Sequence, residues 1–511
     1  MQYGENSLNQ AGADSLRKRQ EKWLMECLQH NAMSRYGQDY RFEEIETIQM
    51  YQENVPMVDY ETIEPLIMRM AIGEADVLFQ GVPIAFEVTG GSAGGGKLIP
   101  YTEKSFEDFQ SAILPWLFDV SQRYGISGKA AYWSISPALR RATATDGGIK
   151  IGVSDAEYLG DIATGTFNAS PVVPSWVGEL YDIDKWQLVT LYWLIRCKEL
   201  ELISVWSPTF LLMIMEVLEE RSDELLFLFA EGGMIAEYVL SPDGDACERL
   251  RNYLVNKESA TLWPRIKLIS CWQDGSSRPF FERLKHRFPH ASFQSKGLIS
   301  TEGVVTMPNA DGLPLLSSAS GFYEFIDVNG DNYLAHELAT DKIYEIILTT
   351  SGGLYRYRTG DMLQCEGYEN NLPILRFMGR KGIVSDMVGE KLNEVFVRSA
   401  LQSIGSFSML IPDKRITPHY ILLSDLPDTP DKTIEVEKKL MENPQYAYAR
   451  KIGQLGSLEP LIIKDAMLLY IEYKTNTGSR VGDIKIPSLN SDDEWIQIII
   501  GNNNENSTDL S

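Results

Sequence analysis

The chain reads Glu87-Val-Thr-Gly-Gly-Ser-Ala-Gly-Gly-Gly-Lys-Leu-Ile-Pro100 at its most informative point, where five glycines fall within seven residues. The apolar run 82–88 before them predicts a buried strand. Glycine lets a backbone approach a ligand closely and point successive N–H groups at it. Hydroxyl groups and a lysine add hydrogen-bond donors and a positive charge. The segment therefore predicts a loop that binds the phosphates of a nucleotide.

Two general interpretations compete for this loop. Residues 91–97 satisfy the first seven positions of the P-loop pattern, but the eighth is Leu98 where a magnesium-binding Ser or Thr is required. Pro100 also favours an extended chain where a P-loop continues into a helix. The second interpretation is a glycine-rich surface loop, which would need neither a strand before it nor a lysine at its end.

A third interpretation accounts for more of the chain. Residues 89–97 resemble the phosphate loop of the acyl-adenylate-forming enzymes, whose usual form is T-[SG]-G-[ST]-[TS]-G-x-x-K. Further motifs of that superfamily follow in order: Lys296-Gly-Leu-Ile-Ser-Thr-Glu-Gly303, Leu354-Tyr-Arg-Tyr-Arg-Thr-Gly-Asp361, Leu375-Arg-Phe-Met-Gly-Arg380, Gly389-Glu-Lys-Leu-Asn393 and Gly482-Asp-Ile-Lys-Ile-Pro487. Their order and spacing fit a single architecture, which each motif alone would not establish.

Four details of these motifs are typical of one family. Together with the 354–361 motif, Phe322-Tyr-Glu-Phe-Ile326, Leu262-Trp-Pro264 and Asn443-Pro-Gln-Tyr-Ala-Tyr-Ala-Arg450 resemble the GH3 acyl acid–amido synthetases. The resemblance runs from about residue 23 to residue 487. It implies an ATP-dependent ligase that adenylates a carboxylic acid, releases pyrophosphate, and transfers the acyl group to the amine of an amino acid, releasing AMP. Plant members conjugate auxin and jasmonate, but nothing in this chain ties it to either acid.

The implied fold is α/β with two domains. Residues 1–380 would form a large adenylation domain of β-sheets and packed helices, and residues 381–500 a smaller, mobile α+β lid. Gly379-Arg-Lys-Gly382 is the best candidate for the boundary, because glycines flank two charged residues after an apolar strand. The polar stretch 501–511 is expected to be disordered.

The resemblance also assigns roles to residues of the nucleotide site. Mg²⁺ would be held by Glu302 together with ATP phosphates, its usual mode of binding. The ribose hydroxyls would donate to Asp361, since a carboxylate accepts hydrogen bonds. Tyr323 would stack on adenine, and Arg376 would link the nucleotide to domain movement. The phosphates would be bound by Thr89, Gly91, Ser92, Gly94, Lys97 and Thr301.

Catalysis would fall to Glu302 and two lysines, Lys391 and Lys485. Because Lys485 lies in the C-terminal domain, it would act only when that domain closes over the site. The acyl pocket would be lined by central-domain residues, with Trp133, Val205, Trp206 and Phe210 as candidates that could equally belong to the core. No residue is identified as the base for the amine.

Composition excludes several other classes of function. The 511 residues carry a net charge of −24, with 44% hydrophobic and 23% charged residues. Such an acidic globular chain is not expected to bind nucleic acid or an anionic membrane surface. Five scattered cysteines without a C-x-x-C pair argue against a disulfide framework or a structural zinc site. We expect a cytoplasmic enzyme whose partners are a small carboxylic acid and an amino acid, with no obligatory protein partner.

Periodicity predicts the principal elements. Apolar spacing predicts helices over residues 13–33, 104–123, 186–202, 208–220 and 432–441, and β-branched or apolar runs predict strands over 266–270, 344–350, 419–424 and 468–473. This alternation favours an α/β fold.

Two other functions remain open from sequence. The acceptor could be coenzyme A or a carrier thiol, although the chain carries no phosphopantetheine attachment motif. Alternatively, Gly90 and Ala93, which stand where the family often has hydroxyls, could mark a non-catalytic sensor of a nucleotide or small acid.

Overall fold

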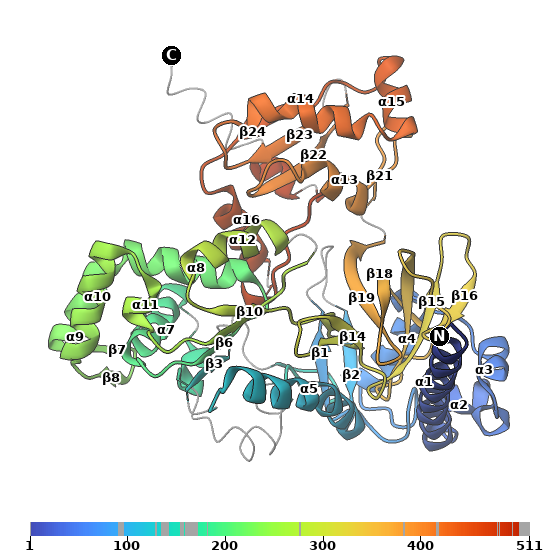
Figure 1. The fold of residues 1–511 in the computed structure, drawn as a ribbon. Helices are drawn as coiled ribbons and strands as arrows, with labels where there is room; N and C mark the ends of the chain where they lie inside the picture. The colour runs from blue at the N-terminus through green and yellow to red at the C-terminus, as the bar shows by residue number, and fades with distance from the viewer. Residues whose placement is uncertain are drawn as a thin grey trace.

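The computed structural model describes residues 2–89, 97–127, 130–133, 143–153, 158, 172–180, 182–274, 277–381, 384–414, 418–477, 479, 481–492 and 494–499, with side chains from residue 15 onward. It confirms the predicted α/β class. Three N-terminal sheets with their helices form the larger part of the molecule, and a smaller C-terminal sheet lies across from them (Figure 1).

Helices at the N-terminus pack beside a large antiparallel sheet. They are α1 (Gln2–Asn31), α2 (Arg35–Asp39), α3 (Ile48–Asn54) and α4 (Tyr60–Ala71). The side chain of Thr47 caps the N-terminus of α3, and that of Asp59 caps the N-terminus of α4. Residue Gln20 of α1 donates to the carbonyls of Ser318 and Gly321, which ties this helix to the sheet. The helix predicted over 13–33 is therefore confirmed and begins earlier.

The large sheet has seven strands in the order β13-β14-β19-β18-β17-β15-β16. Its members are β13 (Thr306–Pro308), β14 (Pro314–Leu316), β15 (Phe322–Ile326), β16 (Asn332–Leu334), β17 (Ile343–Thr349), β18 (Tyr357–Glu369) and β19 (Leu372–Arg380). The two longest strands, β18 and β19, pair antiparallel with Asp361 opposite Arg380. A short hairpin, β11 (Ile299–Ser300) and β12 (Gly303–Val304), precedes the sheet.

A second sheet is parallel throughout, in the order β10-β9-β6-β3. Its strands are β3 (Ala131–Trp133), β6 (Leu202–Ser204), β9 (Leu268–Ser270) and β10 (Ser292–Gln294). One face packs on α7 (Ile183–Arg196), α8 (Pro208–Glu220) and α12 (Arg278–Arg287), and the other packs on α5 (Glu103–Tyr124). Helices on both faces are the arrangement that buries a parallel sheet.

A third sheet contains the two strands that flank the glycine-rich segment. Its order is β2-β1-β5-β4, where β1 (Ala85–Val88) and β2 (Leu98–Tyr101) pair antiparallel, and β5 (Lys150–Ile151) and β4 (Thr143–Ala144) complete it. Peripheral elements α9 (Ser222–Glu231), β7 (Gly233–Ile235), β8 (Tyr238–Leu240), α10 (Gly244–Asn256) and α11 (Ser259–Leu262) lie beyond α7.

The C-terminal part has its own three-stranded sheet, β22-β23-β24 (Ser408–Asp413, His419–Ser424 and Glu459–Ile462). Helices α13 (Glu394–Leu401), α14 (Thr429–Leu440) and α15 (Pro444–Lys451) cover one face around a core that includes Leu410, Tyr420 and Leu422. A hairpin, β20 (Val384–Ser385) and β21 (Leu392–Asn393), leads into α13. None of the helices in the described ranges is both long and apolar enough to cross a membrane.

Most predicted elements are confirmed, and two need correction. Helix α7 ends at Arg196, and Leu202 begins strand β6. The strand predicted over 468–473 is a helix, α16 (Ala466–Asn476). Its buried residues, at positions 466, 467, 470, 471, 473, 474 and 475, cover a wide arc of the helix, so the apolar run shows no narrow stripe at helical spacing.

Candidate active site

Strands β1 and β2 pair on either side of the glycine-rich segment, whose residues 90–96 lie outside the described ranges. Val88 pairs with Leu98, the Thr89 N–H donates to the Lys97 carbonyl at 2.9 Å, and the Lys97 N–H donates to Thr89 Oγ1 at 3.3 Å. Because a strand follows Lys97, the P-loop interpretation is wrong. Lys97 Nζ lies 3.9 Å from Glu61 Oε1 and 5.0 Å from the centre of the Tyr60 ring. Three predicted phosphate ligands, Gly91, Ser92 and Gly94, lie outside the described residues.

Two motif carboxylates meet at one arginine. Glu302 occupies the turn between β11 and β12, and Asp361 lies on β18. Arg380, at the end of β19, places Nε 3.4 Å from Asp361 Oδ1 and Nη2 3.8 Å from Glu302 Oε1. Both carboxylates are only 6% exposed. The neighbouring Thr301 carbonyl accepts a hydrogen bond from the Tyr101 hydroxyl at 2.6 Å.

Electrostatics of this cluster depend on burial and on two cations. Burial raises the pKa of Asp361 above its ordinary range, Arg380 and then Lys485 oppose that shift, and Glu302 adds to it. Glu302 Oε1 is buried without a hydrogen-bond partner among the described residues. Buried acceptors normally have a hydrogen-bond partner, and here the nearest cation is Arg380 Nη2 at 3.8 Å, so this oxygen retains the capacity to accept a hydrogen bond.

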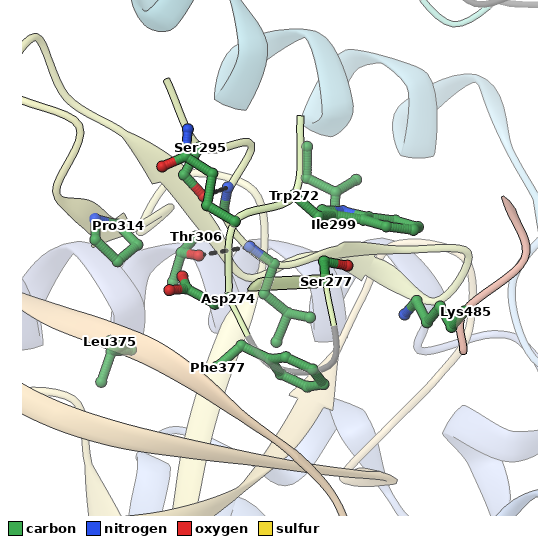
Figure 2. Close-up of a pocket in the computed structure, with 13 residues that line it drawn as sticks. Trp272, Asp274, Ser277, Ser295, Ile299, Thr306, Pro314, Leu375, Phe377 and Lys485 are labelled. Carbon is green, nitrogen blue, oxygen red and sulfur yellow. Dashed lines mark hydrogen bonds between the residues drawn. The ribbon is translucent and has the colours of Figure 1, made fainter. Parts of the chain in front are cut away.

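A pocket is lined by Lys485, the lysine whose charge acts on Asp361, and Figure 2 shows its walls. The space between the walls is about 530 Å³, a volume that includes space open to solvent. The walls come from the parallel sheet, the β11–β12 region, the large sheet and the C-terminal segment: Trp272, Gln273, Asp274, Ser277, Ser295, Gly297, Leu298, Ile299, Thr306, Pro314, Leu375, Phe377 and Lys485. Elements far apart in the sequence thus form one binding site.

Lys485 reaches this pocket from the C-terminal segment (Figure 2). Its ammonium lies 5.1 Å from the centre of the Trp272 ring and 5.9 Å from that of Phe377. Both distances are within the range of a cation–π contact. The exposed lysine is therefore held against two aromatic walls while its charge acts on Asp361.

Arg376 is placed beside the pocket but is already paired. It donates to Asp274 Oδ1 at 2.7 Å and to Glu366 Oε1 at 2.5 Å. These carboxylates raise the pKa of the guanidinium further. Since Asp274 lines the pocket, Arg376 orients that wall carboxylate, a contact that its position near the predicted hinge did not indicate.

Tyr323 is not in the nucleotide site. It is 3% exposed in the core of the large sheet, and its hydroxyl hydrogen-bonds to the Val304 and Ser317 carbonyls. A ring enclosed in this way offers no face to adenine, so the predicted stacking role is wrong.

Lys391 is not among the residues that line the pocket. It is exposed beside β21, with a backbone φ of 45°. Neighbouring Glu390 instead points inward and accepts from the Tyr420 hydroxyl at 2.5 Å. Lys485 thus lines the pocket, and the catalytic role of Lys391 stays a prediction.

The four predicted acyl-pocket residues separate into two groups. Val205 and Phe210 are 0% and 1% exposed and belong to the core around α7 and α8, so they are not free to line a pocket. Trp133 and Trp206 are partly buried at the carboxyl end of the parallel sheet. Trp206 packs against Trp272 with ring centres 6.0 Å apart, which connects this region to the pocket.

Sequence reasoning missed Trp272, Asp274 and Phe377 as wall residues. A signal was available for the first two, because residues 271–274 directly follow β9, and ligands of α/β sheets bind beyond the carboxyl ends of strands. Phe377 has no such signal, since its contact with Lys485 depends on where the C-terminal part lies.

Comparisons with known proteins agree with this architecture. The GH3 family N-terminal domain matches residues 11–293, and the GH3 family central domain matches residues 315–380. The chain is 24% identical to the indole-3-acetic acid-amido synthetase GH3.15 of Arabidopsis thaliana over 94% of this chain and 92% of that one. It is 23% identical to the jasmonoyl–L-amino acid synthetase JAR4 of Nicotiana attenuata over 92% and 90% of the two chains.

Solved structures show the same fold. The acyl acid amido synthetase AtGH3.15 in complex with 2,4-DB superposes with a TM-score of 0.84 at 20% identity, covering 97% of this chain and 95% of that chain. A 2-hydroxyisobutyryl-CoA ligase in complex with 2-HIB-AMP gives a TM-score of 0.55 at 11% identity, covering 97% and 92%. With two family domains matched across more than half of its length, the chain belongs to the GH3 family.

Proposed function

We propose that this protein is an ATP-dependent acyl acid–amido synthetase, an AMP-forming ligase that joins a carboxylic acid to the amine of an amino acid. The observation that carries the proposal is that Lys485, which lines the pocket, also acts electrostatically on Asp361, the carboxylate that shares Arg380 with Glu302. Family membership and the names of its relatives support the same reaction class.

In the first step the acid's carboxylate attacks the α-phosphorus of ATP and displaces pyrophosphate. Charge accumulates on the phosphate oxygens, so positioned cations stabilise the transition state. Lys485 supplies one such charge. Thr89 and Lys97, at the two ends of the glycine-rich segment, bind the leaving phosphates, and Thr301 lies beside the α-phosphate. Asp361 accepts hydrogen bonds from the ribose hydroxyls.

Mg²⁺ fits this site because Glu302 Oε1 is a buried carboxylate oxygen that accepts no hydrogen bond among the described residues; its ion pair with Arg380 Nη2, at 3.8 Å, would have to loosen when the ion binds. Among the described residues no three His, Cys, Asp or Glu side chains gather as a metal cage. That agrees with the usual binding of Mg²⁺ through one carboxylate and substrate phosphates. When bound, the ion would supply charge neutralisation on the phosphates, and Glu302 would hold it.

In the second step the deprotonated amine attacks the acyl carbonyl, and AMP leaves. Lys485 must then withdraw for the acceptor to enter, because its ammonium lies against the rings of Trp272 and Phe377 in the pocket wall. Domain movement of this kind, which brings a lid residue to the site for one step and removes it for the next, is known in enzymes that catalyse two steps at one site.

We place the domain boundary between residues 380 and 381, giving an adenylation domain of residues 1–380, a lid of residues 381–500 and a tail of residues 501–511. In support, Arg380 is bound to the Thr359 carbonyl and Lys381 to Glu345, so the contacts of β19 with the large sheet end at this peptide, and strand β20 of the C-terminal part begins at Val384. A rotation of the chain that follows this anchored peptide would carry Lys485. All five cysteines are free thiols, which fits a reducing, cytoplasmic location.

The test is release of pyrophosphate and AMP from ATP, measured over a panel of aromatic, fatty and hydroxy acids with and without mixed amino acids. We expect pyrophosphate release that requires an acid and AMP release that one amino acid accelerates. If only coenzyme A or another thiol accelerates AMP release, the product is a thioester and the proposed amide product is wrong. Nucleotide binding without turnover across the panel would contradict the catalytic proposal.

A further inference from the structure

Tyr101 joins two segments of the candidate nucleotide site that are far apart in the sequence. It is the last residue of β2, the strand that follows Lys97 at the end of the glycine-rich segment. Its hydroxyl donates to the Thr301 carbonyl at 2.6 Å. Thr301 and Glu302 form the turn between β11 and β12, so one hydrogen bond connects the strand beyond the glycine-rich segment to the turn that carries the predicted magnesium carboxylate.

The strand end that carries this hydroxyl is held on both sides. Tyr101 pairs with Ala85 of β1, and the next residue, Thr102, caps the N-terminus of α5. The tyrosine ring is 8% exposed and packs against Phe106 and Tyr158, whose ring centres each lie 5.6 Å from its own. The hydroxyl therefore has a position that the surrounding structure fixes.

The turn at the other end of this hydrogen bond belongs to a very short hairpin. Two residue pairs join its strands, Ile299 with Val304 and Ser300 with Gly303. A two-stranded hairpin is at best marginally stable by itself, so contacts from outside it help to set the position of its turn. The hydrogen bond from Tyr101 is such a contact, and it reaches the backbone of the turn directly.

The environment of the hydroxyl keeps it a donor. Burial raises the pKa of Tyr101 above its ordinary range, a hydrogen bond with Tyr158 opposes the shift, and the charges of Glu87 and Glu302 add to it. The hydroxyl therefore stays protonated at neutral pH. Because it binds a backbone carbonyl and not the carboxylate, this hydrogen bond can persist when Glu302 exchanges its ion pair with Arg380 for a metal ion.

We propose that Tyr101 is a positioning residue, whose hydroxyl holds the Thr301–Glu302 turn in place and thereby sets the affinity of the site for the complex of Mg²⁺ with ATP. The inference deepens the proposed function and rests on it for the role of Glu302. A group behind a metal ligand fixes the orientation of that ligand, and its loss typically lowers metal affinity about 10- to 100-fold. Since Tyr101 acts on the backbone beside the ligand, we expect the lower end of this range, about tenfold.

Calorimetry of nucleotide binding tests this role without turnover. The probe is α,β-methylene-ATP, which cannot release pyrophosphate, titrated once in Mg²⁺ and once in a metal chelator. Tyr101→Phe keeps the ring and removes the hydroxyl, so it should weaken binding about tenfold in Mg²⁺ and less than about twofold in the chelator. In a Glu302→Gln background the same change should cost less than about twofold under both conditions, because the two residues then no longer share an interaction.

Tyr192→Phe provides a matched control. The Tyr192 side chain is also buried, and its hydroxyl donates to the backbone carbonyl of Ser241 at 2.6 Å. Its loss should lower thermal stability about as much as the loss of the Tyr101 hydroxyl and leave both nucleotide affinities unchanged. In acid-dependent ATP–pyrophosphate exchange, Tyr101→Phe should raise the Mg²⁺ concentration for half-maximal rate about tenfold, and excess Mg²⁺ should restore most of the rate.

Four results would overturn the inference. The unmodified protein could gain no affinity from Mg²⁺, or Tyr101→Phe could bind within about twofold of the unmodified protein in Mg²⁺. The variant could also lose affinity equally in Mg²⁺ and in the chelator, or lose it in full in the Glu302→Gln background. Magnesium-dependent binding that requires the Tyr101 hydroxyl, without turnover of any acid, would contradict the ligase proposal alone. Turnover together with binding that Tyr101→Phe leaves unchanged would contradict this inference alone.

Discussion

Lys485→Ala should have a small effect on the stability of the fold and a large effect on the rate of adenylation. The side chain is exposed, and its described contacts are the rings of Trp272 and Phe377 at 5.1 and 5.9 Å. Exposed cation–π contacts are worth about 0.5–1 kcal/mol each, and the longer one lies at the edge of the range. Losing both should lower the free energy of unfolding by about 1 kcal/mol.

Its effect on adenylation should be much larger. Removing one preorganised donor from a site of developing charge typically costs about 100- to 1,000-fold in rate, or about 3–4 kcal/mol. The assay is acid-dependent ATP–pyrophosphate exchange, which reports the first step alone, with thermal unfolding measured on the same samples. Lys464→Ala removes another exposed C-terminal lysine away from the pocket and serves as the control. An exchange rate within about threefold of the unmodified protein would refute the catalytic role, since it is far below the expected loss.

Three further perturbations have defined outcomes. Burial raises the pKa of Asp361 above 3.8, so keeping this carboxyl ionised costs stability at pH values above 3.8. Asp361→Asn should therefore raise the unfolding temperature at pH 7, and this increase should shrink as pH falls toward 3.8. The same variant should abolish nucleotide binding, measured by calorimetry. Arg356→Met strands the buried Glu324 carboxylate, so chemical denaturation should show a loss of about 3–5 kcal/mol. Trp272→Leu should slow pyrophosphate exchange about two- to fivefold by removing the nearer ring from Lys485, with Trp272→Phe restoring part of the rate.

Local pattern and motif order predicted much of the fold. Pro208–Glu220 is a helix with the predicted bounds because Ser207 caps it and proline occupies its first turn. His419–Ser424 is a strand with the predicted bounds. The strand predicted over residues 468–473 was wrong because a short apolar run does not distinguish a buried strand from a buried helix. In the structure these residues form a helix, and Tyr470 packs against Trp495.

The site was harder to predict because its members are defined by contacts across the chain. A tyrosine within a family-like motif could not be assigned to pocket or core until Gln20 and Ser320 were seen to bind Tyr323. In the same way, Arg376 lies at a position that suggests nucleotide contact, yet two carboxylates compete for its guanidinium. Sequence identifies the residue type, and only the packing shows which partner it has.

Lys296 shows the same limit. It lies in the 296–303 motif, five positions before Thr301, and the motif pattern assigns it no role. In the structure it is buried, its Nζ donates to Ser204 Oγ at the end of β6, and it faces the rings of Trp206 and Trp116. A parallel sheet aligns the last residues of strands that are distant in sequence, so one short motif can contribute some residues to the nucleotide site and another to the packing at these strand ends. Motif order therefore identifies the family, whereas the contacts of each residue within a motif follow from the strands and helices around it.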